Sequence, residues 1–179
     1  QFAKHGAITT DYDLSSGHLA HAKRNFELRG LKGEFVHGDG EQMPFPDNTF
    51  DCVYSNGVIH HTPNTQSVID EMYRVLKPGG RIIIMVYAEH SLHYYRNLVI
   101  EIGMDKQQLE TRSVGDIMSE TVEISEHGSR PLVKVYTAKR LRQMFKRFDG
   151  VSICKRQMVP EERPNWLAWA PTDLLGRLM

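Results

Sequence analysis

Apolar positions in the first ninety residues follow two periods, which predict strands and helices in alternation. Runs rich in β-forming residues predict four strands, at 7–13, 34–39, 50–55 and 82–87. Helical spacing predicts one helix that begins at Ser15 or Ser16 and closes at Gly30, and a second that stops at Pro78-Gly79-Gly80. This alternation, with one strand apolar throughout, indicates an α/β fold with a doubly wound, mostly parallel sheet.

The pattern changes after residue 90. Residues 91–130 begin with one amphipathic stripe and continue as an acidic, loosely periodic stretch, which is typical of a helical insertion or lid. A strand at 132–136 and a helix capped by Thr137 restore the alternation. We therefore predict one domain in three parts: 1–90, the insertion 91–130, and 131–179.

Charge is segregated along the chain. The 179 residues carry 22 basic and 22 acidic side chains, and this zero balance argues against a general nucleic-acid binder. Residues 33–73, however, hold 7 acidic and no basic side chains, while residues 127–179 have a net charge of +7. The acidic block favours a cationic ligand and would repel a phosphate-rich dinucleotide.

Apolar runs and cysteines limit the cellular context. The longest apolar run, 82–88, has 7 residues, whereas a membrane helix needs about 20. No segment resembles a signal peptide, and Cys52 and Cys154 lack the spacing of a zinc site or a disulfide framework. These features predict a cytoplasmic protein with no transmembrane segment and no metal.

Polar residues that follow the predicted strands are the first candidates for a site, because ligands of doubly wound sheets bind at the carboxyl ends of the strands. Asp13 can accept both hydroxyls of a ribose, or it can cap the next helix. Asp39 can accept from an exocyclic amine, with Gly40 allowing a flat ring to approach, or it belongs to an ordinary acidic turn. Ser55 follows the third strand.

Two further patterns have competing interpretations. His60 is a candidate general base near neutral pH or a capping residue, and its neighbour His61 cannot face the same way to complete a metal site. Tyr73 and Lys77 have the spacing of a short-chain dehydrogenase pair, although chance explains them better because a Pro-Gly-Gly turn follows at once.

Four motifs, in this order, resemble one family. They are Asp11-Tyr-Asp-Leu-Ser15, the segment from Gly38 to Asp51, Ser55-Asn-Gly-Val-Ile-His-His61 and Leu76-Lys-Pro-Gly-Gly80. Together they are similar to class I S-adenosylmethionine-dependent methyltransferases of the methyltransferase domain 11 type, with a Rossmann-like fold. The resemblance covers residues 1 to about 90, and the remainder is similar only in layout to an acceptor-binding half.

The resemblance implies how the adenosine half of the cofactor would be held. Asp13 would bind the ribose hydroxyls, with Leu14 against the adenine. Asp39 would accept from the adenine amine, and Gly40 and Met43 would wall the ring. The cofactor is a sulfonium without phosphate, which gives the acidic block a chemical reason.

The same resemblance implies the remaining roles. Ser55 and Asn56 would lie near the methionine portion, and His60 near the transferred methyl group. The reaction would be methyl transfer to a small-molecule acceptor by in-line displacement at the methyl carbon, in which the enzyme mainly positions donor and acceptor. The acceptor and the oligomeric state stay open. The alternatives are a nicotinamide-dependent oxidoreductase and a non-catalytic, methyltransferase-like binding module.

The chain departs from the family at its start. The glycine-rich loop that cradles the methionine end, and the first strand before it, are not found among these residues, and 2–7 resembles the end of the helix that follows that loop. We therefore expect the sequence to be a fragment of a longer methyltransferase.

The first prediction is that residues 1–179 alone bind cofactor weakly or not at all, because the backbone cradle for the methionine end is lacking. Calorimetric titration with S-adenosylhomocysteine measures this, and micromolar binding by this chain would contradict the expectation.

Overall fold

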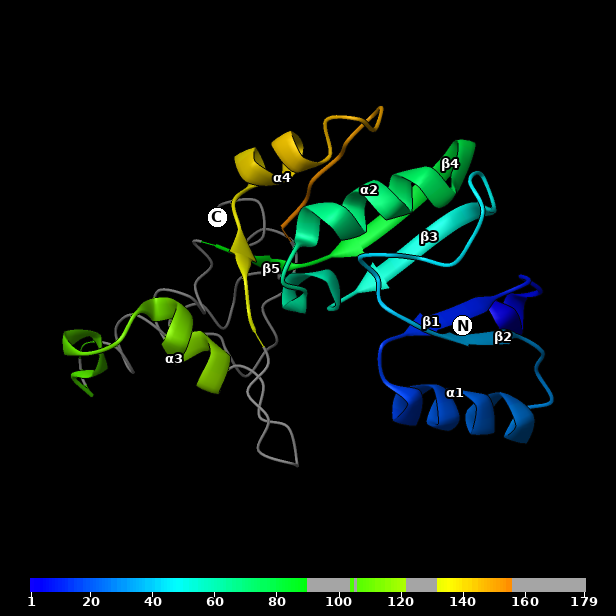
Figure 1. Ribbon diagram of the computed structural model, residues 1–179, viewed down its shortest axis with the longest axis horizontal. Helices are drawn as coiled ribbons and strands as arrows, with labels where there is room; N and C mark the ends of the chain where they lie inside the picture. The colour runs from blue at the N-terminus through cyan, green and yellow to red at the C-terminus, as the bar shows by residue number, and fades with distance from the viewer. Residues whose placement is uncertain (90–103, 105, 122–131, 156–179) are drawn as a thin grey trace, which may run out of the picture. The chain divides into compact units, whose positions relative to one another are not determined.

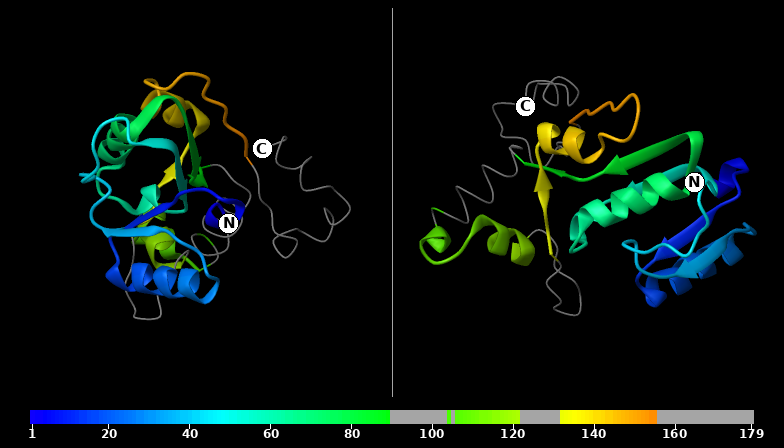
Figure 2. Two further views of the ribbon diagram at one scale, coloured as in Figure 1. Left: turned by 90° about the vertical axis from the view of Figure 1, so that its right-hand side faces the viewer. Right: turned by 45° about the horizontal axis from the view of Figure 1, so that its top comes forward.

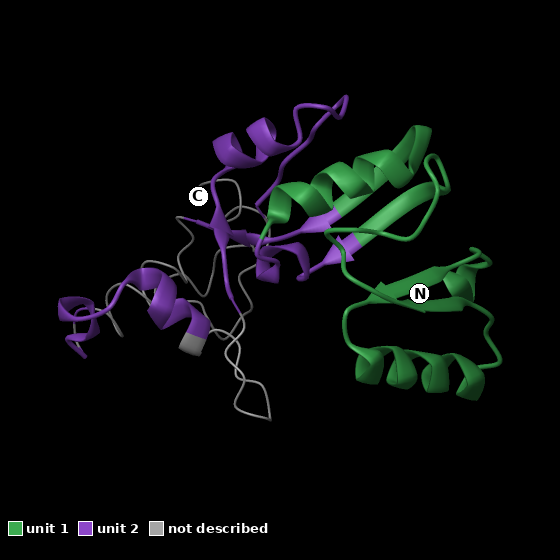
Figure 3. Cartoon of the chain, in the orientation of Figure 1, with its two compact units in different colours: residues 1–54, 64–83 green, residues 55–63, 84–179 purple. Residues whose placement is uncertain are grey.

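The computed structural model describes residues 1–89, 104, 106–121 and 132–155 (Figure 1). The chain divides into two compact units, which are described separately (Figure 3). Unit 1 comprises residues 1–54 and 64–83, and unit 2 comprises residues 55–63 and 84–179. The predicted division near residues 90 and 130 stays a prediction.

Unit 1 begins with a parallel strand pair joined by a helix. A short 3₁₀ helix, η1 (Ala3–His5), ends at Gly6, whose left-handed backbone (φ 88°) makes the expected helix-ending turn. Strands β1 (Thr10–Asp13) and β2 (Glu34–His37) then pair in parallel, from Thr10↔Glu34 to Asp13↔His37. The α-helix α1 (Ser16–Leu28) connects them and runs along one face of the pair (Figures 1 and 2). The predicted strand–helix–strand order is thereby confirmed.

The second strand pair of unit 1 is built around helix α2 (Thr65–Val75). Strands β3 (Phe50–Asn56) and β4 (Leu76–Met85) form this pair, and their last residues continue into unit 2. Four apolar side chains at helical spacing are buried along α2: Val68, Ile69, Met72 and Val75. Helical spacing predicts one face made of Val68, Met72, Val75 and Leu76. The first three are confirmed, whereas Leu76 is only half-buried and begins β4.

The predicted end of this helix at Pro78-Gly79-Gly80 is wrong. Helix α2 ends at Val75, and Leu76 already has extended backbone (φ −79°, ψ 132°). Proline disfavours helical backbone in the residue before it, so the chain must leave the helix ahead of Pro78. Strand β4 consequently begins six residues before the apolar run that predicted it.

Arg74 joins α2 to the loop between β2 and β3. Its guanidinium donates to both carboxylate oxygens of Glu71 (2.7 Å each), to the carbonyls of Met43 (2.9 Å) and Phe45 (2.6 Å), and to Asp47 (2.9 Å). Glu71 also accepts from the backbone N–H of Met43 at 2.7 Å. Hydrogen bonds from Arg74 hold the pKa of Glu71 below its usual value, because they stabilise the ionised carboxylate.

Unit 2 contains a short strand pair and several helices. Strands β5 (Tyr87–Ala88) and β6 (Val135–Tyr136) pair in parallel. The helices among its described residues are η2 (Ile59–His61), η4 (Gln108–Glu110), α3 (Val114–Thr121) and α4 (Ala138–Met144). The side chains of Ile117, Met118 and Val133 form a buried apolar cluster.

Several predictions about the second half meet different outcomes. Thr137 caps α4 as expected, accepting from the N–H of Arg140 at 3.1 Å. The predicted 132–136 strand is shorter, because only Val135 and Tyr136 pair with β5. The amphipathic stripe of 92–102 lies outside the described residues. No described helix has both the length and the apolar character required to span a bilayer.

The second prediction concerns Arg74→Met, which removes the donors to Glu71 and to two carbonyls while keeping an apolar stem. We expect a Tm several degrees lower, with Arg81→Met on the exposed surface of β4 as the control. The pKa of Glu71 is lowered on folding from a usual value of 4.5. Its stabilisation is therefore complete above about pH 4.5 and is lost as the pH falls through the lowered value. Thermal melts should show the Tm values of the wild type and Arg74→Met converging as the pH falls into the acid range. Equal Tm values for these two proteins at pH 7 would refute the role of Arg74.

Candidate functional site

Asp13 is the last residue of β1, and its side chain is partly buried, with 34% exposed. Its Oδ1 accepts from the N–H of Ser15 at 2.7 Å, and its Oδ2 lies 3.7 Å from Nδ1 of His18. Ser15 is the helix cap, since its Oγ accepts from the N–H of His18 at 3.2 Å. Asp13 therefore accepts a hydrogen bond within the turn before α1, and the cap of the helix is Ser15 and not Asp13. A carboxylate has about four acceptor positions, so this one can also accept two hydroxyls.

A second carboxylate adds to the negative charge near Asp13. Asp11 lies two residues earlier, which places both side chains on the same side of β1. Burial raises the pKa of Asp11, and the charge of Asp13 raises it further. This end of the strand therefore disfavours additional anions.

Asp39 lies in a turn just beyond β2. The N–H of Gly38 donates to the carbonyl of Asp13 at 3.1 Å, which extends the strand pairing by one step and brings the two predicted carboxylates to one edge of the pair. Oδ1 of Asp39 accepts from the N–H of Glu41 at 2.9 Å. Oδ2 makes no hydrogen bond to any described residue and belongs to an exposed side chain, so it is available to a ligand.

Of the three predicted neighbours of the adenine, Leu14 and Met43 are held by backbone hydrogen bonds. The carbonyl of Leu14 accepts from Nε2 of His37 at 2.8 Å, assuming the tautomer that donates there, and the Leu14 side chain is 68% exposed. The N–H of Met43 donates to Glu71, and the carbonyl of Met43 accepts from Arg74. A Cβ on Gly40 would lie 3.6 Å from Val68, an ordinary contact, so crowding within the chain does not require this glycine.

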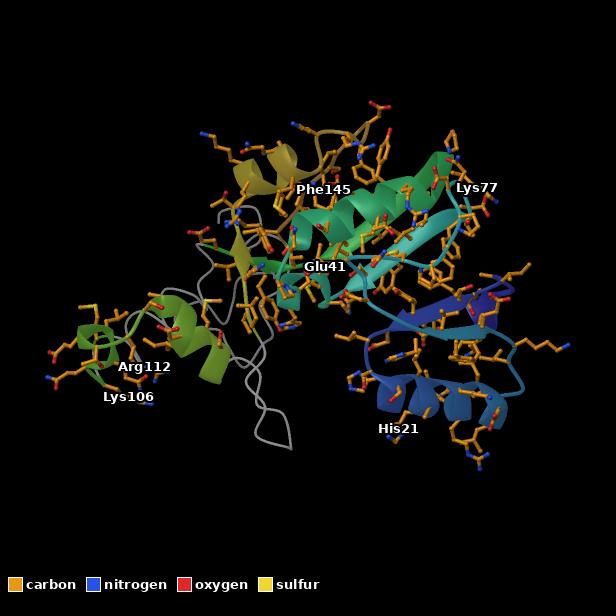
Figure 4. All side chains as sticks on the ribbon, viewed as in Figure 1. His21, Glu41, Lys77, Lys106, Arg112 and Phe145 are labelled. Atoms are coloured by element: carbon orange, nitrogen blue, oxygen red, sulfur yellow. The ribbon has the colours of Figure 1, made fainter. Side chains whose placement is uncertain are left out.

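Glu41 ties the same turn to the start of α2 (Figure 4). Its Oε1 accepts from the N–H of Asn64 at 2.7 Å, and the Asn64 side chain caps α2 by accepting from the N–H of Ser67. The turn that carries Asp39 is thus connected to β1, through strand pairing, and to α2.

The predicted residues of unit 2 have a different environment. Ser55 is 7% exposed, and its Oγ has no hydrogen-bond partner among the described residues. Asn56 is exposed, and Gly57 follows with left-handed backbone (φ 73°) and an N–H that donates to the carbonyl of Met85 at 3.1 Å. A buried hydroxyl without a described partner fits a residue that contacts a polar ligand.

His60 is fully buried in unit 2. Its ring centroid lies 4.0 Å from that of His61 and 4.3 Å from that of Tyr87, and its carbonyl accepts from the N–H of Lys134 at 3.1 Å. Nζ of Lys134 also donates to the carbonyls of Thr62 (2.8 Å) and Pro63 (2.7 Å). A catalytic role for His60 stays a prediction, and it requires the acceptor to reach a buried ring.

The Tyr73 and Lys77 spacing does not form a dehydrogenase pair. Tyr73 belongs to α2. Lys77 lies in β4, beyond the end of the helix (Figure 4). Nζ of Lys77 donates to Oδ1 of Asp51 at 2.9 Å. The pair that the oxidoreductase alternative requires is therefore not built.

The order of elements agrees with the comparisons to known proteins. Residues 1–84 match the family described as methyltransferase domain. This match covers just under half of the chain. A demethylmenaquinone methyltransferase of Streptomyces avermitilis is 30% identical over 141 residues, which are 79% of this chain and 54% of the relative. A sterol 24-C-methyltransferase of Pneumocystis carinii is 44% identical over 77 residues, which are 42% of this chain and 19% of the relative.

Solved structures agree in fold. A SAM-dependent methyltransferase from Methanosarcina mazei superposes with a TM-score of 0.61 at 21% identity, over 82% of this chain and 70% of that one. The PH0226 protein from Pyrococcus horikoshii gives a TM-score of 0.58 at 20% identity, over 87% of this chain and 69% of that one. The predicted Rossmann-like class I methyltransferase fold is confirmed. The chain spans about half or less of the two curated relatives named above.

The third prediction tests the cap that orders the segment after Asp13. Ser15→Ala removes the acceptor for the N–H of His18, so we expect a loss of about 1 kcal/mol in the free energy of unfolding. Urea denaturation measures it, with Ser16→Ala, at an exposed position of the first turn, changing stability by less than about 0.5 kcal/mol. The reverse ranking of the two variants would assign the cap to Ser16.

Proposed function

We propose that the full-length protein transfers a methyl group from S-adenosylmethionine to a small-molecule acceptor. The observation that carries the proposal is the placement of Asp13 and Asp39 at the same edge of the β1–β2 pair, within a methyltransferase domain. A ligand with a ribose and an amino-bearing ring presents hydroxyl and amine donors that suit two such acceptors.

The side chains of unit 1 would hold the adenosine. Asp13 keeps one oxygen on the N–H of Ser15 and still has acceptor positions for the ribose hydroxyls. Asp39 keeps Oδ1 on Glu41 and offers Oδ2 to the adenine amine. Leu14, Gly40 and Met43 supply an exposed apolar side chain, a position without a side chain, and a fixed backbone beside these carboxylates.

When bound, S-adenosylmethionine supplies an electrophilic methyl carbon with a neutral sulfur as its leaving group. The protein's own work is then binding and orientation, because an in-line reaction depends on alignment. We propose Ser55 and Asn56 as contacts of the methionine portion, on the basis of the buried Oγ of Ser55. We propose His60 as the group that accepts a proton where the acceptor must lose one.

The names of the relatives bear on the acceptor. They include sterol 24-C-methyltransferases and a ubiquinone/menaquinone biosynthesis C-methyltransferase. All of these act on small molecules and methylate carbon, so we propose carbon as the methylated atom here. A screen of small apolar acceptors with radiolabelled cofactor would identify the product.

The fourth prediction is that Asp13→Asn weakens binding of S-adenosylhomocysteine by the full-length protein by about 10- to 100-fold. The amide removes the charge and one acceptor, and hydrogen bonds to charged groups contribute about 1.5–3 kcal/mol. Asp51→Asn, at an exposed acid of β3, makes the same chemical change as a control.

Calorimetry on the wild type and both variants separates the outcomes. Unchanged affinity in Asp13→Asn would refute the ribose assignment alone. A wild-type full-length protein that binds no S-adenosylhomocysteine would overturn the proposed function.

A further inference from the structure

Tyr12 contacts the turn that carries Asp39, although it lies on the other strand. It directly precedes Asp13 in β1, so its side chain points to the opposite face of the strand. Its hydroxyl donates to the carbonyl of Asp39 at 2.7 Å, across 27 residues of sequence. One side chain of β1 is therefore hydrogen-bonded to the backbone of the predicted adenine contact.

The ring of Tyr12 lies against Phe45 and Gly38. It packs edge-on against Phe45, with centroids 5.3 Å apart and planes at 71°, and Phe45 packs in the same way against Phe50 at 5.0 Å. Gly38 also adjoins the ring, because a Cβ there would overlap the hydroxyl of Tyr12 and lie 2.8 Å from its Cε2. Gly38 is not among the glycines with positive φ, so glycine is required here to make room for the ring.

Hydrogen bonds to β1 and to the start of α2 anchor the residues on either side of Asp39, and further bonds lie within the turn itself. The Asp39 carbonyl also accepts from the N–H of Gln42 at 3.0 Å, and Oδ1 accepts from the N–H of Glu41 at 2.9 Å. Both bonds lie within the turn and fix its shape. The Tyr12 hydroxyl adds a hydrogen bond from a side chain of β1 to the carbonyl of Asp39 itself, and so contributes to the direction in which Oδ2 of Asp39 points.

We propose that Tyr12 is a positioning residue for adenine recognition, which sets the orientation of Asp39 by hydrogen bonding to its carbonyl. The inference rests on the proposed function, since it assigns a role within the same cofactor site. Tyr12 acts through Asp39 and does not itself contact the ligand. Its contribution should therefore depend on whether the bound base presents an amine to the Asp39 carboxylate.

The protonation state of Tyr12 supports this role. Burial raises the pKa of its phenol above the usual 10, and the charges of Asp39 and Glu71 raise it further. The hydroxyl therefore remains a donor across the neutral range.

The fifth prediction compares two ligands on Tyr12→Phe in the full-length protein. S-adenosylhomocysteine carries the amine, and S-inosylhomocysteine has a carbonyl in its place. We expect the Kd of the first to rise about 3- to 10-fold, as for the loss of one neutral hydrogen bond. The Kd of the second should change less, so the preference for adenine should fall.

This ratio distinguishes positioning from general damage, because a destabilised fold weakens both ligands equally. Gly38→Ala should reproduce the fall in preference by displacing the Tyr12 ring, and it serves as the second variant if Tyr12→Phe folds poorly. Tyr73→Phe removes a hydroxyl from a tyrosine of α2, and Gly115→Ala adds a methyl group with only an ordinary contact, 3.6 Å from Ser113. Both controls should keep the wild-type ratio.

The outcomes are separable. An unchanged preference in Tyr12→Phe, or an equal loss of both ligands, overturns the role of Tyr12. Failure of the wild type to bind S-adenosylhomocysteine overturns the proposed function instead.

Discussion

The hydrogen bonding of the Arg74 guanidinium is the interaction on which the loop between β2 and β3 depends, and this loop carries the predicted contacts to adenine. It donates to the carbonyls of residues 43 and 45 and to the carboxylates of residues 47 and 71. All four acceptors belong to the acidic block 33–73, which contains no lysine or arginine of its own. An arginine suits this position because its fixed fork of donors reaches several acceptors at once. Loop geometry and charge compensation are therefore supplied by one side chain, which comes directly after the acidic block in sequence.

This arrangement alters the interpretation of the acidic block. Three of its seven carboxylates are paired with basic residues from just outside it: Asp47 and Glu71 with Arg74, and Asp51 with Lys77. Asp39 is not paired with any base in the described residues. Fewer of the seven charges are thus left to act on a ligand than the count suggests, and Asp39 is one that remains, just beyond the end of β2.

Local patterns predicted the elements that depend on local contacts. The helix over α1, its start near Ser15, and the buried face of α2 follow from spacing and capping, which act within a few residues. The early end of α2 and the short β6 were missed because they depend on backbone competition at Pro78 and on a partner strand far along the chain. The described strands also form three separate two-stranded sheets, and apolar patterns do not encode which strand edges meet.

The same distinction applies to the site. Asp13 and Asp39 were found because parallel strands carry their last residues to one edge. Tyr12 and Gly38 were missed because their importance comes from a contact between strands. The glycine directly before Asp39 was the available signal, since a small residue there leaves space for a neighbour's ring.

Lys134 donates hydrogen bonds to the carbonyls of residues 60, 62 and 63, and these bonds limit the order in which the chain can fold. During synthesis, β1, α1 and β2 can pair as soon as β2 has emerged, because their contacts span short stretches of sequence. The carbonyls of His60, Thr62 and Pro63 cannot gain these donors until residue 134 is available. The hydrogen bonding of the turn at 60–63 therefore stays incomplete until about seventy further residues have been synthesised, and the turn reaches its final structure late in translation.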